Sequence, residues 1–320
     1  MTVLLLGGNG LLGHNVLRQL LDRGHSVHAL VRNVQSLHIQ HPDITHFEGS
    51  FLNPDTLRQA AQGCNAIINC TGTTDMSLPH LDDYLPVNKE GCQRVAEVME
   101  QLHIDTLVQV STANTIGYGS PTHTADETLP WQPPFSQSYY AQSKKAGEEI
   151  TLRLAQRHPD WHIIVVNPGF MLGAYDYKPS SGQLLQAAYR LPLMLAPRGG
   201  KSFVPVKDAA TAIVNALTQG THGEKYLLTG ENLTLRQFYR LQATTCGYRQ
   251  CILPVPNTLL LIVGRLGDLL RALGLRTQVS TKNVRQLMVR EYYTNLKARQ
   301  HLSMPTTPLA QSIQDYFLSK

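Results

Sequence analysis

The sequence has few of the features that mark disulfide-linked, zinc-binding or nucleic-acid-binding proteins. Its 320 residues include only 5 cysteines, an odd number without a Cys-x-x-Cys pair, which argues against a disulfide framework and a zinc site. Lysine and arginine are scattered and the formal net charge is only +5, so no nucleic-acid partner is indicated. We therefore expect free thiols in a reducing cytoplasm, no bound metal and a small-molecule ligand, for which a weakly basic chain suits an anionic group.

Long uninterrupted apolar runs are also missing. The apolar stretch at residues 256–275 is broken by Gly264, Arg265 and Asp268, so we predict no membrane-spanning helix. An apolar helical face beside Arg265 and Arg271 could still touch a membrane surface. We favour instead a helix that packs over the core or over a substrate pocket.

The first half of the sequence alternates short β-branched runs with amphipathic helical stretches. This alternation is the signature of βαβ units and a parallel sheet, and right-handed crossovers make it a doubly wound α/β fold. A chain of this length is at the upper limit for one core, so we expect a smaller second lobe. The predicted strands are 2–7, 26–31, 44–49, 65–70, 105–111 and 162–167, and the helices among them include 11–24, 54–63 and 88–103.

After Pro168 the regular pattern weakens. Segments punctuated by prolines up to Pro205 are predicted to be loops, and a last strand is predicted at 224–230. Further helices are predicted at 207–220, at 231–245 with Thr234 as its cap, and through most of the tail from Pro254. We therefore predict a Rossmann domain at 1–170, with 205–230 returning to it, and a smaller, mostly helical C-terminal substrate-binding lobe at 171–204 and 231–320.

Three glycines follow the first predicted strand with the spacing G-x-x-G-x-x-G. Gly7 allows a tight turn, Gly10 allows the backbone to approach a pyrophosphate, and Gly13 allows the helix to pack on the sheet. The helix N-terminus adds partial positive charge. The turn predicts a dinucleotide phosphate site, to which its other residues, Asn9, Leu11 and Leu12, also belong.

The residue at the end of the second predicted strand is Arg32 rather than Asp or Glu. A carboxylate there would bond the ribose hydroxyls and repel a 2′-phosphate, whereas a guanidinium donates to phosphate oxygens and stacks on adenine. We therefore predict that the 1–170 domain binds NADP(H).

A candidate acid/base pair lies on the predicted helix that begins near residue 139. Tyr140 and Lys144 are four residues apart, so both side chains project from one face. A neighbouring ammonium stabilises a phenolate and thereby lowers the pKa of tyrosine. Ser111 and Thr112 follow the fifth predicted strand, at the edge where open α/β sheets bind ligands.

Together these features resemble the short-chain dehydrogenase/reductase family. The glycine turn, the hydroxyls at 111–112, the Tyr-x-x-x-Lys pair and VVNPGFMLG at 165–173 carry the resemblance, and the segments around Asn88 and at 203–213 resemble its extended type. The stretches VRN and STANTIG are most similar to the branch of dihydroflavonol reductases and 3-beta-hydroxysteroid dehydrogenases, followed by nucleotide-sugar epimerases. The resemblance covers most of residues 1–245.

The resemblance implies a role for each residue of the candidate site. Tyr140 would be the general acid/base, and Lys144 would hold the nicotinamide ribose and lower the Tyr140 pKa. Thr112, or alternatively Ser111, would bond the substrate oxygen, and Asn88 would support Lys144. The other implied cofactor contacts are Ser50, Phe51, Cys70, Thr71, Gly72, Ser111, Pro168, Gly169 and Met171.

We expect an NADP-dependent oxidoreductase that moves a hydride between nicotinamide and the carbonyl or secondary alcohol of a mainly apolar small molecule. The apolar substrate is inferred from Met171, Leu172, Tyr175 and Tyr177, in a segment expected to reach the pocket. Two alternatives stay open: a nucleotide-sugar epimerase or dehydratase, and a non-catalytic protein that senses NADPH. A homodimer is one arrangement that we consider.

Overall fold

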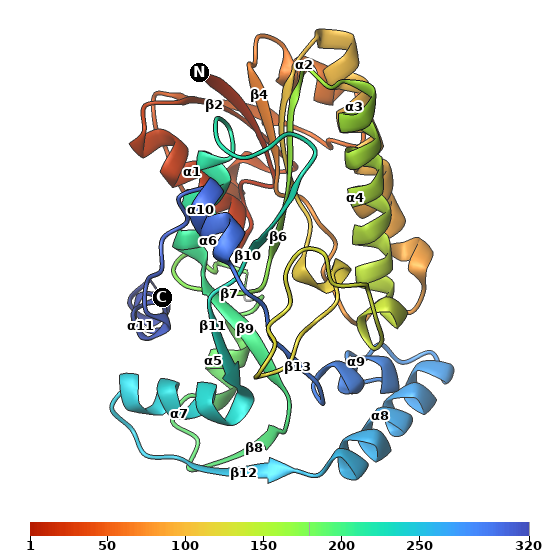
Figure 1. Ribbon diagram of the computed structural model, residues 1–320, viewed down its shortest axis with the longest axis vertical. Coiled ribbons are helices and arrows are strands. Elements are labelled where there is room, and N and C mark those ends of the chain that lie inside the picture. Colours follow the sequence, from red (N-terminus) through yellow and green to blue (C-terminus); the bar gives the residue numbers. More distant parts are fainter. Residues whose placement is uncertain (179, 320) are drawn as a thin grey trace.

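The chain folds around a central parallel sheet covered by helices on both faces (Figure 1). The computed structural model describes residues 1–178 and 180–319. Its 7-stranded sheet has the order β10-β6-β5-β4-β1-β2-β3, which extends the doubly wound order 3-2-1-4-5-6. The strands are β1 (Thr2–Leu6), β2 (Ser26–Val31), β3 (Ile44–Glu48), β4 (Ala66–Asn69), β5 (Thr106–Val110), β6 (His162–Pro168) and β10 (Lys225–Leu228). The predicted α/β fold and these strands are confirmed.

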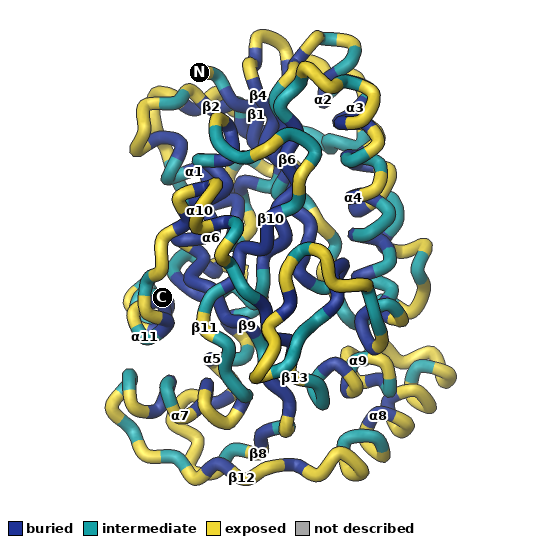
Figure 2. Tube along the Cα trace, in the orientation of Figure 1, coloured by how far each residue is buried: buried dark blue, intermediate teal, exposed yellow. Residues whose placement is uncertain are grey.

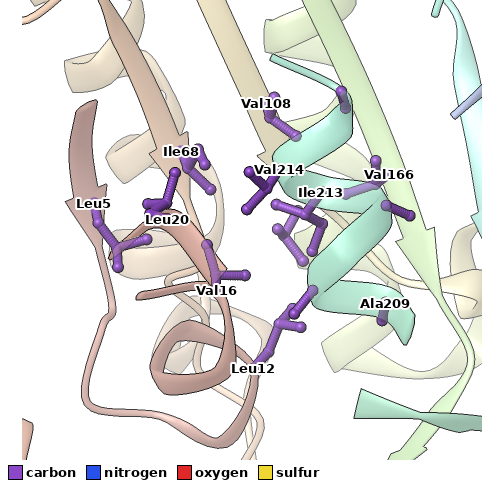
Figure 3. Close-up of a cluster of buried hydrophobic side chains, with 14 of the residues drawn as sticks. Leu5, Leu12, Val16, Leu20, Ile68, Val108, Val166, Ala209, Ile213 and Val214 are labelled. Atoms are coloured by element: carbon purple, nitrogen blue, oxygen red, sulfur yellow. The ribbon is translucent and has the colours of Figure 1, made fainter. Parts of the chain in front are cut away.

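Alternate residues of each central strand face opposite helical layers, as strand geometry requires. Leu5 packs with α1 (Leu11–Asp22) and α6 (Val206–Asn215), and Figure 3 shows this cluster. Leu4 packs on the other face in a second cluster. That face is covered by α2 (Pro54–Ala61), α3 (Gly91–Leu102) and α4 (Tyr139–Arg157). Because both faces of the sheet are covered, its inner strands are largely apolar, and Figure 2 shows β1, β4 and β6 as buried. The edge strand β3 exposes Thr45, His46 and Glu48.

The prediction of loops between Pro168 and Pro205 is wrong. This segment contains β7 (Phe170–Leu172), α5 (Gln183–Ala188), β8 (Leu193–Pro197) and β9 (Gly200–Pro205). β7, β9, β11 (Glu231–Thr234) and β13 (Arg290–Glu291) form a small sheet, and β8 pairs with β12 (Cys251–Val255). The strands that pair with β8 and β9 are distant in sequence, so the local sequence pattern does not predict these strands.

The C-terminal part is rich in helices, as predicted. They are α7 (Leu235–Thr245), α8 (Asn257–Ala272), α9 (Thr281–Gln286), α10 (Leu296–His301) and α11 (Leu309–Leu318). The predicted cap of α7 is confirmed. The Thr234 hydroxyl accepts a hydrogen bond from the backbone amide of Gln237 at 3.2 Å, and the Gln237 side-chain oxygen accepts one from the backbone amide of Thr234 at 2.8 Å. Two orphan amides at the start of the helix are thus satisfied.

One C-terminal segment crosses back to the central sheet. Ala298, Leu302 and Met304 pack in the same hydrophobic cluster as α1 and α6. α11 then returns to the cluster that contains α7 and β9. The substrate-binding lobe at 171–204 and 231–320 therefore remains a prediction. Within it, Ala298, Leu302 and Met304 pack on the central sheet rather than on the rest of the lobe.

Candidate functional site

The predicted site residues gather at the edge where the parallel strands end. Gly7 follows β1, Arg32 follows β2, and Thr112 follows β5 by two residues. Residues 70–72 follow β4, and Pro168 is the last residue of β6. Because all these strands are parallel, their carboxyl ends share one edge, which is where open α/β sheets bind ligands.

The glycine turn is closed so tightly that side chains are excluded at two of its positions. A Cβ on Gly13 would lie 2.1 Å from the Gly7 carbonyl oxygen. Gly7 has φ of +80°, and a Cβ there would lie 3.0 Å from the backbone of Cys70. Gly10 donates its amide to the Gly7 oxygen at 3.1 Å and then begins helix α1. The turn therefore has the backbone that a dinucleotide pyrophosphate requires, at a helix N-terminus.

The next two residues of this turn belong to the core rather than to an open surface. Leu12 is buried, and Leu11 is partly buried against the same cluster. They hold the start of α1 on the sheet and thereby fix the direction of its N-terminus.

Ser36, which the sequence analysis missed, joins the glycine turn to the segment after β2. Asn9 donates its side-chain amide to the Ser36 hydroxyl at 2.8 Å, and Ser36 donates to the Asn33 carbonyl at 2.6 Å. Arg32, immediately before Asn33, is exposed. Ser36 and Arg32 therefore lie on the short segment that follows β2, where the 2′ position of the adenine ribose is read in this fold.

Lys144 is buried, and its ammonium group reaches the ends of β4 and β5. Its Nζ atom donates to the Val110 carbonyl at 2.7 Å and to the Thr71 carbonyl at 3.4 Å. Burial lowers the pKa of Lys144 below its ordinary value. A Cβ on Gly72 would be 3.6 Å from this Nζ, so the chain passes close to the ammonium group.

Asn88 connects the loop after β4 with helix α4. Its Oδ1 accepts from the Thr73 amide at 2.8 Å, and its Nδ2 donates to the Ser143 hydroxyl at 2.8 Å. Ser143 in turn donates to the Tyr140 carbonyl at 2.8 Å. Asn88 thus supports the helix that carries the Tyr-x-x-x-Lys pair through Ser143.

This contact depends on a glycine that the sequence analysis did not select. Gly147 of α4 lies against the residue Asn88, and a Cβ at Gly147 would be 2.0 Å from the Asn88 carbonyl oxygen. Asn88 itself lies in a π-helical turn, Pro86–Glu90, just before α3. The close approach of these two elements sets the position of Asn88 relative to α4.

Tyr140 and Thr112 face each other across the site. Burial raises the pKa of Tyr140 above its ordinary value of 10.0, and a side-chain hydrogen bond with Thr112 acts in the opposite direction. This differs from the expectation that Lys144 lowers the Tyr140 pKa. Burial dominates here, and the Lys144 ammonium group is engaged by the carbonyls of Val110 and Thr71.

Glu148, one turn after Lys144, is a buried carboxylate that the sequence analysis missed. Its Oε2 atom accepts hydrogen bonds from the Ser111 hydroxyl at 2.8 Å and the Thr115 hydroxyl at 2.8 Å. The Asn167 side-chain amide donates to the same oxygen at 2.9 Å. Glu148 therefore ties the ends of β5 and β6 to helix α4.

The second carboxylate oxygen of Glu148 meets two lysines. Lys145 Nζ lies 3.1 Å and Lys225 Nζ 3.6 Å from Oε1. Burial acts to raise the pKa of Glu148, but the lysines and the hydrogen bonds bring it below its ordinary value of 4.5. The only local signal for this residue is its spacing, four residues after Lys144 on the same helical face.

Two predicted cofactor contacts, Ser50 and Phe51, lie in a turn after β3. The Ser50 hydroxyl accepts from the Leu52 amide at 3.2 Å. The Phe51 ring packs on α3 so closely that a Cβ at Gly91 would be 2.5 Å from it. The Phe51 ring therefore has a packing role, whatever else it contacts.

The predicted cofactor contacts Pro168, Gly169 and Met171 lie on a segment that connects the central sheet with the small one. Gly169 donates its amide to the Leu228 carbonyl at 3.0 Å, and a Cβ at Gly169 would be 2.6 Å from the Ser202 carbonyl oxygen. Pro168 ends β6, and Met171 of β7 pairs in register with Val204 of β9. This segment is therefore held between two sheets at the carboxyl edge.

Three of the four residues taken as signs of an apolar substrate, Leu172, Tyr175 and Tyr177, pack against other side chains of the protein. Leu172 is fully buried in the core cluster that includes α7 and α11. The Tyr175 ring lies 5.0 Å from the His14 ring, and the Tyr177 ring lies 4.3 Å from the His38 ring. Leu172 fills the core, and both tyrosines pack beside the start of α1 and the segment after β2, so their apolar character carries no information about the substrate.

Comparison with known proteins places the chain among nucleotide-dependent enzymes. Residues 3–229 match the model of the NAD dependent epimerase/dehydratase family. The chain is 28% identical over 318 residues to a putative dihydroflavonol 4-reductase of Synechocystis sp., covering 97% of this chain and 91% of that protein.

A second relative and a solved structure agree with this match. The chain is 29% identical over 276 residues to 4-hydroxy-2-methyl-3-oxo-4-farnesyl-3,4-dihydroquinoline-1-oxide ketoreductase of Stigmatella aurantiaca, covering 84% of this chain and 80% of that protein. The crystal structure of gox2253 superimposes with a TM-score of 0.84 at 26% identity, covering 99% of this chain and 97% of that one.

Proposed function

The chain belongs to the NAD dependent epimerase/dehydratase family, and from this premise we propose that it is an NADP-dependent reductase of an apolar carbonyl compound. The carbonyl carbon would receive the hydride that a bound nicotinamide cofactor supplies, and Tyr140 would give a proton to the carbonyl oxygen. The observation that carries the proposal is the arrangement at the strand ends, where Tyr140 bonds Thr112 and Lys144 reaches the ends of β4 and β5.

The residues present fit a dinucleotide. The backbone at Gly7 and Gly13 leaves no room for a Cβ, as expected where a pyrophosphate approaches a helix N-terminus. Gly7, Gly10 and Gly13 would hold the pyrophosphate, and Lys144 would hold the nicotinamide ribose. The buried Lys144 ammonium has two backbone carbonyl partners and a lowered pKa, so further acceptors from ribose hydroxyls would stabilise its charge.

The choice of NADP(H) rests on the segment after β2. Arg32 is exposed, and a guanidinium can donate two parallel hydrogen bonds to a phosphate. The Ser36 hydroxyl donates to the Asn33 carbonyl and accepts from Asn9, so it would fix the shape of this segment beside Arg32 rather than bond the phosphate. No carboxylate in residues 30–40 would repel a 2′-phosphate.

Tyr140 carries the proton that carbonyl reduction requires. Because its pKa lies above 10.0, the phenol holds its proton at neutral pH and can donate it to a developing alkoxide. Thr112 would share the substrate oxygen with Tyr140. Ser111 is less suited to that role because its hydroxyl already donates to Glu148.

The apolar substrate is supported by the relatives. One is named a dihydroflavonol 4-reductase and another a ketoreductase of a farnesyl-substituted quinoline oxide. Both names describe reductases, and the second names a ketone substrate with an apolar farnesyl group. The family description supports a second candidate, a nucleotide-sugar epimerase or dehydratase, in which the hydride returns to the same substrate.

Turnover of NADPH separates these candidates. We expect NADPH oxidation, followed by absorbance, with a panel of hydrophobic ketones and none with UDP- or GDP-sugars. Conversion of a nucleotide sugar without net NADPH oxidation would establish the epimerase or dehydratase instead. NADPH binding without conversion of either panel would favour the non-catalytic sensor.

A further inference from the structure

Helix α8 carries a stripe of exposed aliphatic side chains. Their exposed fractions run from 40% for Val263 to 70% for Leu273. Their spacing of three and four residues puts them on one face of the helix. The α8 stripe consists of Leu259, Ile262, Val263, Leu266, Leu269, Leu270 and Leu273.

The helix uses a different face to pack against the protein. Its two buried residues are Gly264 and Gly267. A Cβ at Gly264 would lie 2.6 Å from Val284, and a Cβ at Gly267 would lie 2.3 Å from the Val279 carbonyl oxygen. The glycine face is thus in tight contact with the segment that leads into α9. The α8 stripe remains outside this contact in the described part of the chain.

The C-terminal end of α8 is also fixed in place. The Arg271 guanidinium donates to the Met76 carbonyl at 2.8 Å and to the Thr277 carbonyl at 2.7 Å. These bonds join the helix to the loop after β4. The stripe is therefore presented by an anchored helix.

The strand pair just before α8 exposes more leucines. Leu193, Leu195 and Leu253 are each about half exposed, at 50%, 56% and 46%. Leu195 and Leu253 are register partners, and alternation along β8 puts Leu193 on the same face. β12 leads directly into α8 along the lower edge of Figure 1, and much of this edge is exposed in Figure 2. We call the α8 stripe and these three leucines the lobe-edge surface.

The charges of the segment 257–290, which contains α8 and α9, are almost all positive, and besides hydrogen bonds from Ser77, Arg276 and Arg271 also help to lower the pKa of Asp75 in the loop after β4. From residue 257 to 290 the only acidic residue is Asp268, and its carboxylate accepts a hydrogen bond from the Thr281 amide at 3.1 Å. The exposed basic residues of the same segment are Arg265, Arg276, Lys282, Arg285 and Arg290. The surface therefore combines aliphatic side chains with a positive surround.

We propose that the lobe-edge surface binds the face of an anionic lipid bilayer. Aliphatic side chains on one face of a basic amphipathic helix enter the boundary between headgroups and acyl chains, and arginines and lysines meet the lipid phosphates. A second copy of the chain is a poorer occupant, because a twofold contact brings the same basic patch against itself. No described helix is long and apolar enough to cross a bilayer, so the contact would be peripheral.

Vesicle sedimentation with the full-length chain tests the proposal. We expect binding to vesicles that contain phosphatidylglycerol and little binding to pure phosphatidylcholine. The double variant Leu266→Ser with Leu269→Ser should weaken vesicle binding by about tenfold or more, because serine gains little free energy on transfer from water into the bilayer. Arg265→Gln with Arg276→Gln should weaken it by roughly tenfold or more, since each basic residue contributes about fivefold near an anionic surface.

The matched controls lie on α10, far from α8 in Figure 1. Leu296 is 55% exposed, close to the 57% of Leu266, so Leu296→Ser makes the same change elsewhere, and Arg299→Gln controls for charge. Both should leave vesicle binding unchanged. Circular dichroism and NADPH binding check that every variant is folded.

Three outcomes would overturn the proposal. The first is wild-type protein that stays in the supernatant with phosphatidylglycerol vesicles. The second is equal loss of binding in the α8 and α10 variants. The third is a dimer, detected by light scattering, that the Leu266→Ser and Leu269→Ser variant dissociates while vesicle binding is unaffected, which would make the surface an interface between copies. None of these results depends on the reaction that the chain catalyses.

Discussion

Ser111 donates its hydroxyl to the buried carboxylate of Glu148 at 2.8 Å, whereas the hydroxyl of the next residue, Thr112, accepts from the Asn114 amide at 3.3 Å and acts to lower the pKa of Tyr140, which burial raises. Thr112 has an extended backbone, with φ of −157° and ψ of 149°, and successive side chains in extended chain point in opposite directions. One hydroxyl is thereby turned toward the interior and its neighbour toward the candidate site.

The first prediction separates these two hydroxyls. Thr112→Val should lower kcat/KM by about tenfold or more, because one hydrogen bond to the substrate oxygen is lost. Thr112→Ser should keep most of the activity. Ser111→Ala should instead lower the free energy of unfolding by about 1–3 kcal/mol. A Ser111→Ala enzyme that is stable but inactive would reverse the assignment.

The second prediction concerns acid stability. The folded-state pKa of Glu148 is below its ordinary value of 4.5, so its charged form stabilises the fold. That contribution is present above pH 4.5 and is lost as the pH falls through the lowered pKa. Glu148→Gln should cost about 3–5 kcal/mol at neutral pH, and its difference from the wild type should narrow in acid.

Urea unfolding at neutral and acidic pH measures this difference. Glu149→Gln, at the exposed neighbouring position, is the matched control and should behave as the wild type. A constant difference between Glu148→Gln and the wild type across the acidic range would mean that Glu148 does not titrate with folding.

The third prediction tests the proton donor. Tyr140→Phe should lower turnover by about 100- to 10,000-fold with little change in NADPH affinity. Tyr139→Phe is the control: its ring lies under the Lys282 ammonium at 3.5 Å, and that contact needs no hydroxyl. Near-normal turnover in Tyr140→Phe would exclude Tyr140 as the acid.

The fourth prediction concerns cofactor choice. We expect NADPH to bind at least several-fold more tightly than NADH, and Arg32→Ala to weaken NADPH binding by about tenfold with little effect on NADH. The control is Arg58→Ala, since Arg58 forms an ion pair with Asp55; it should change neither NADPH nor NADH affinity. An unchanged preference in Arg32→Ala would show that the 2′-phosphate is read by other residues.

The fifth prediction concerns the tight contact between Gly147 of α4 and the backbone of Asn88. Gly147→Ala would place a methyl group 2.0 Å from the Asn88 carbonyl oxygen, so the helix must move. We expect a loss of about 1–3 kcal/mol in the free energy of unfolding together with lower turnover. Glu149→Ala, on the same helix and exposed, should show neither effect.

The central sheet could be predicted because its information is local. Its inner strands are buried on both faces and are short, largely apolar runs, and the glycine turn lies directly between β1 and α1. The lobe strands lack such a pattern. β12 contains Pro254, and its partner β8 lies more than fifty residues away, so only the tertiary structure shows that they pair.

The same contrast holds at the site. Tyr140 and Lys144 can be recognised from their spacing alone. The role of Glu148 depends on hydrogen bonds from Ser111, just after β5, and from Asn167 in β6, so it cannot be recognised without the fold. The inference from Leu172 failed for a related reason, because an apolar residue near a site can equally well fill a core. Sequence pattern identified the groups with distinctive chemistry, and the buried supports required the fold.

The return of residues 298–304 to the central sheet also limits how the protein can be re-engineered. A chimera that exchanged one contiguous C-terminal segment would remove Ala298, Leu302 and Met304, which fill the interior beside α6. A recombinant that keeps these residues with the nucleotide-binding half and exchanges the flanking stretches separately would preserve both interiors.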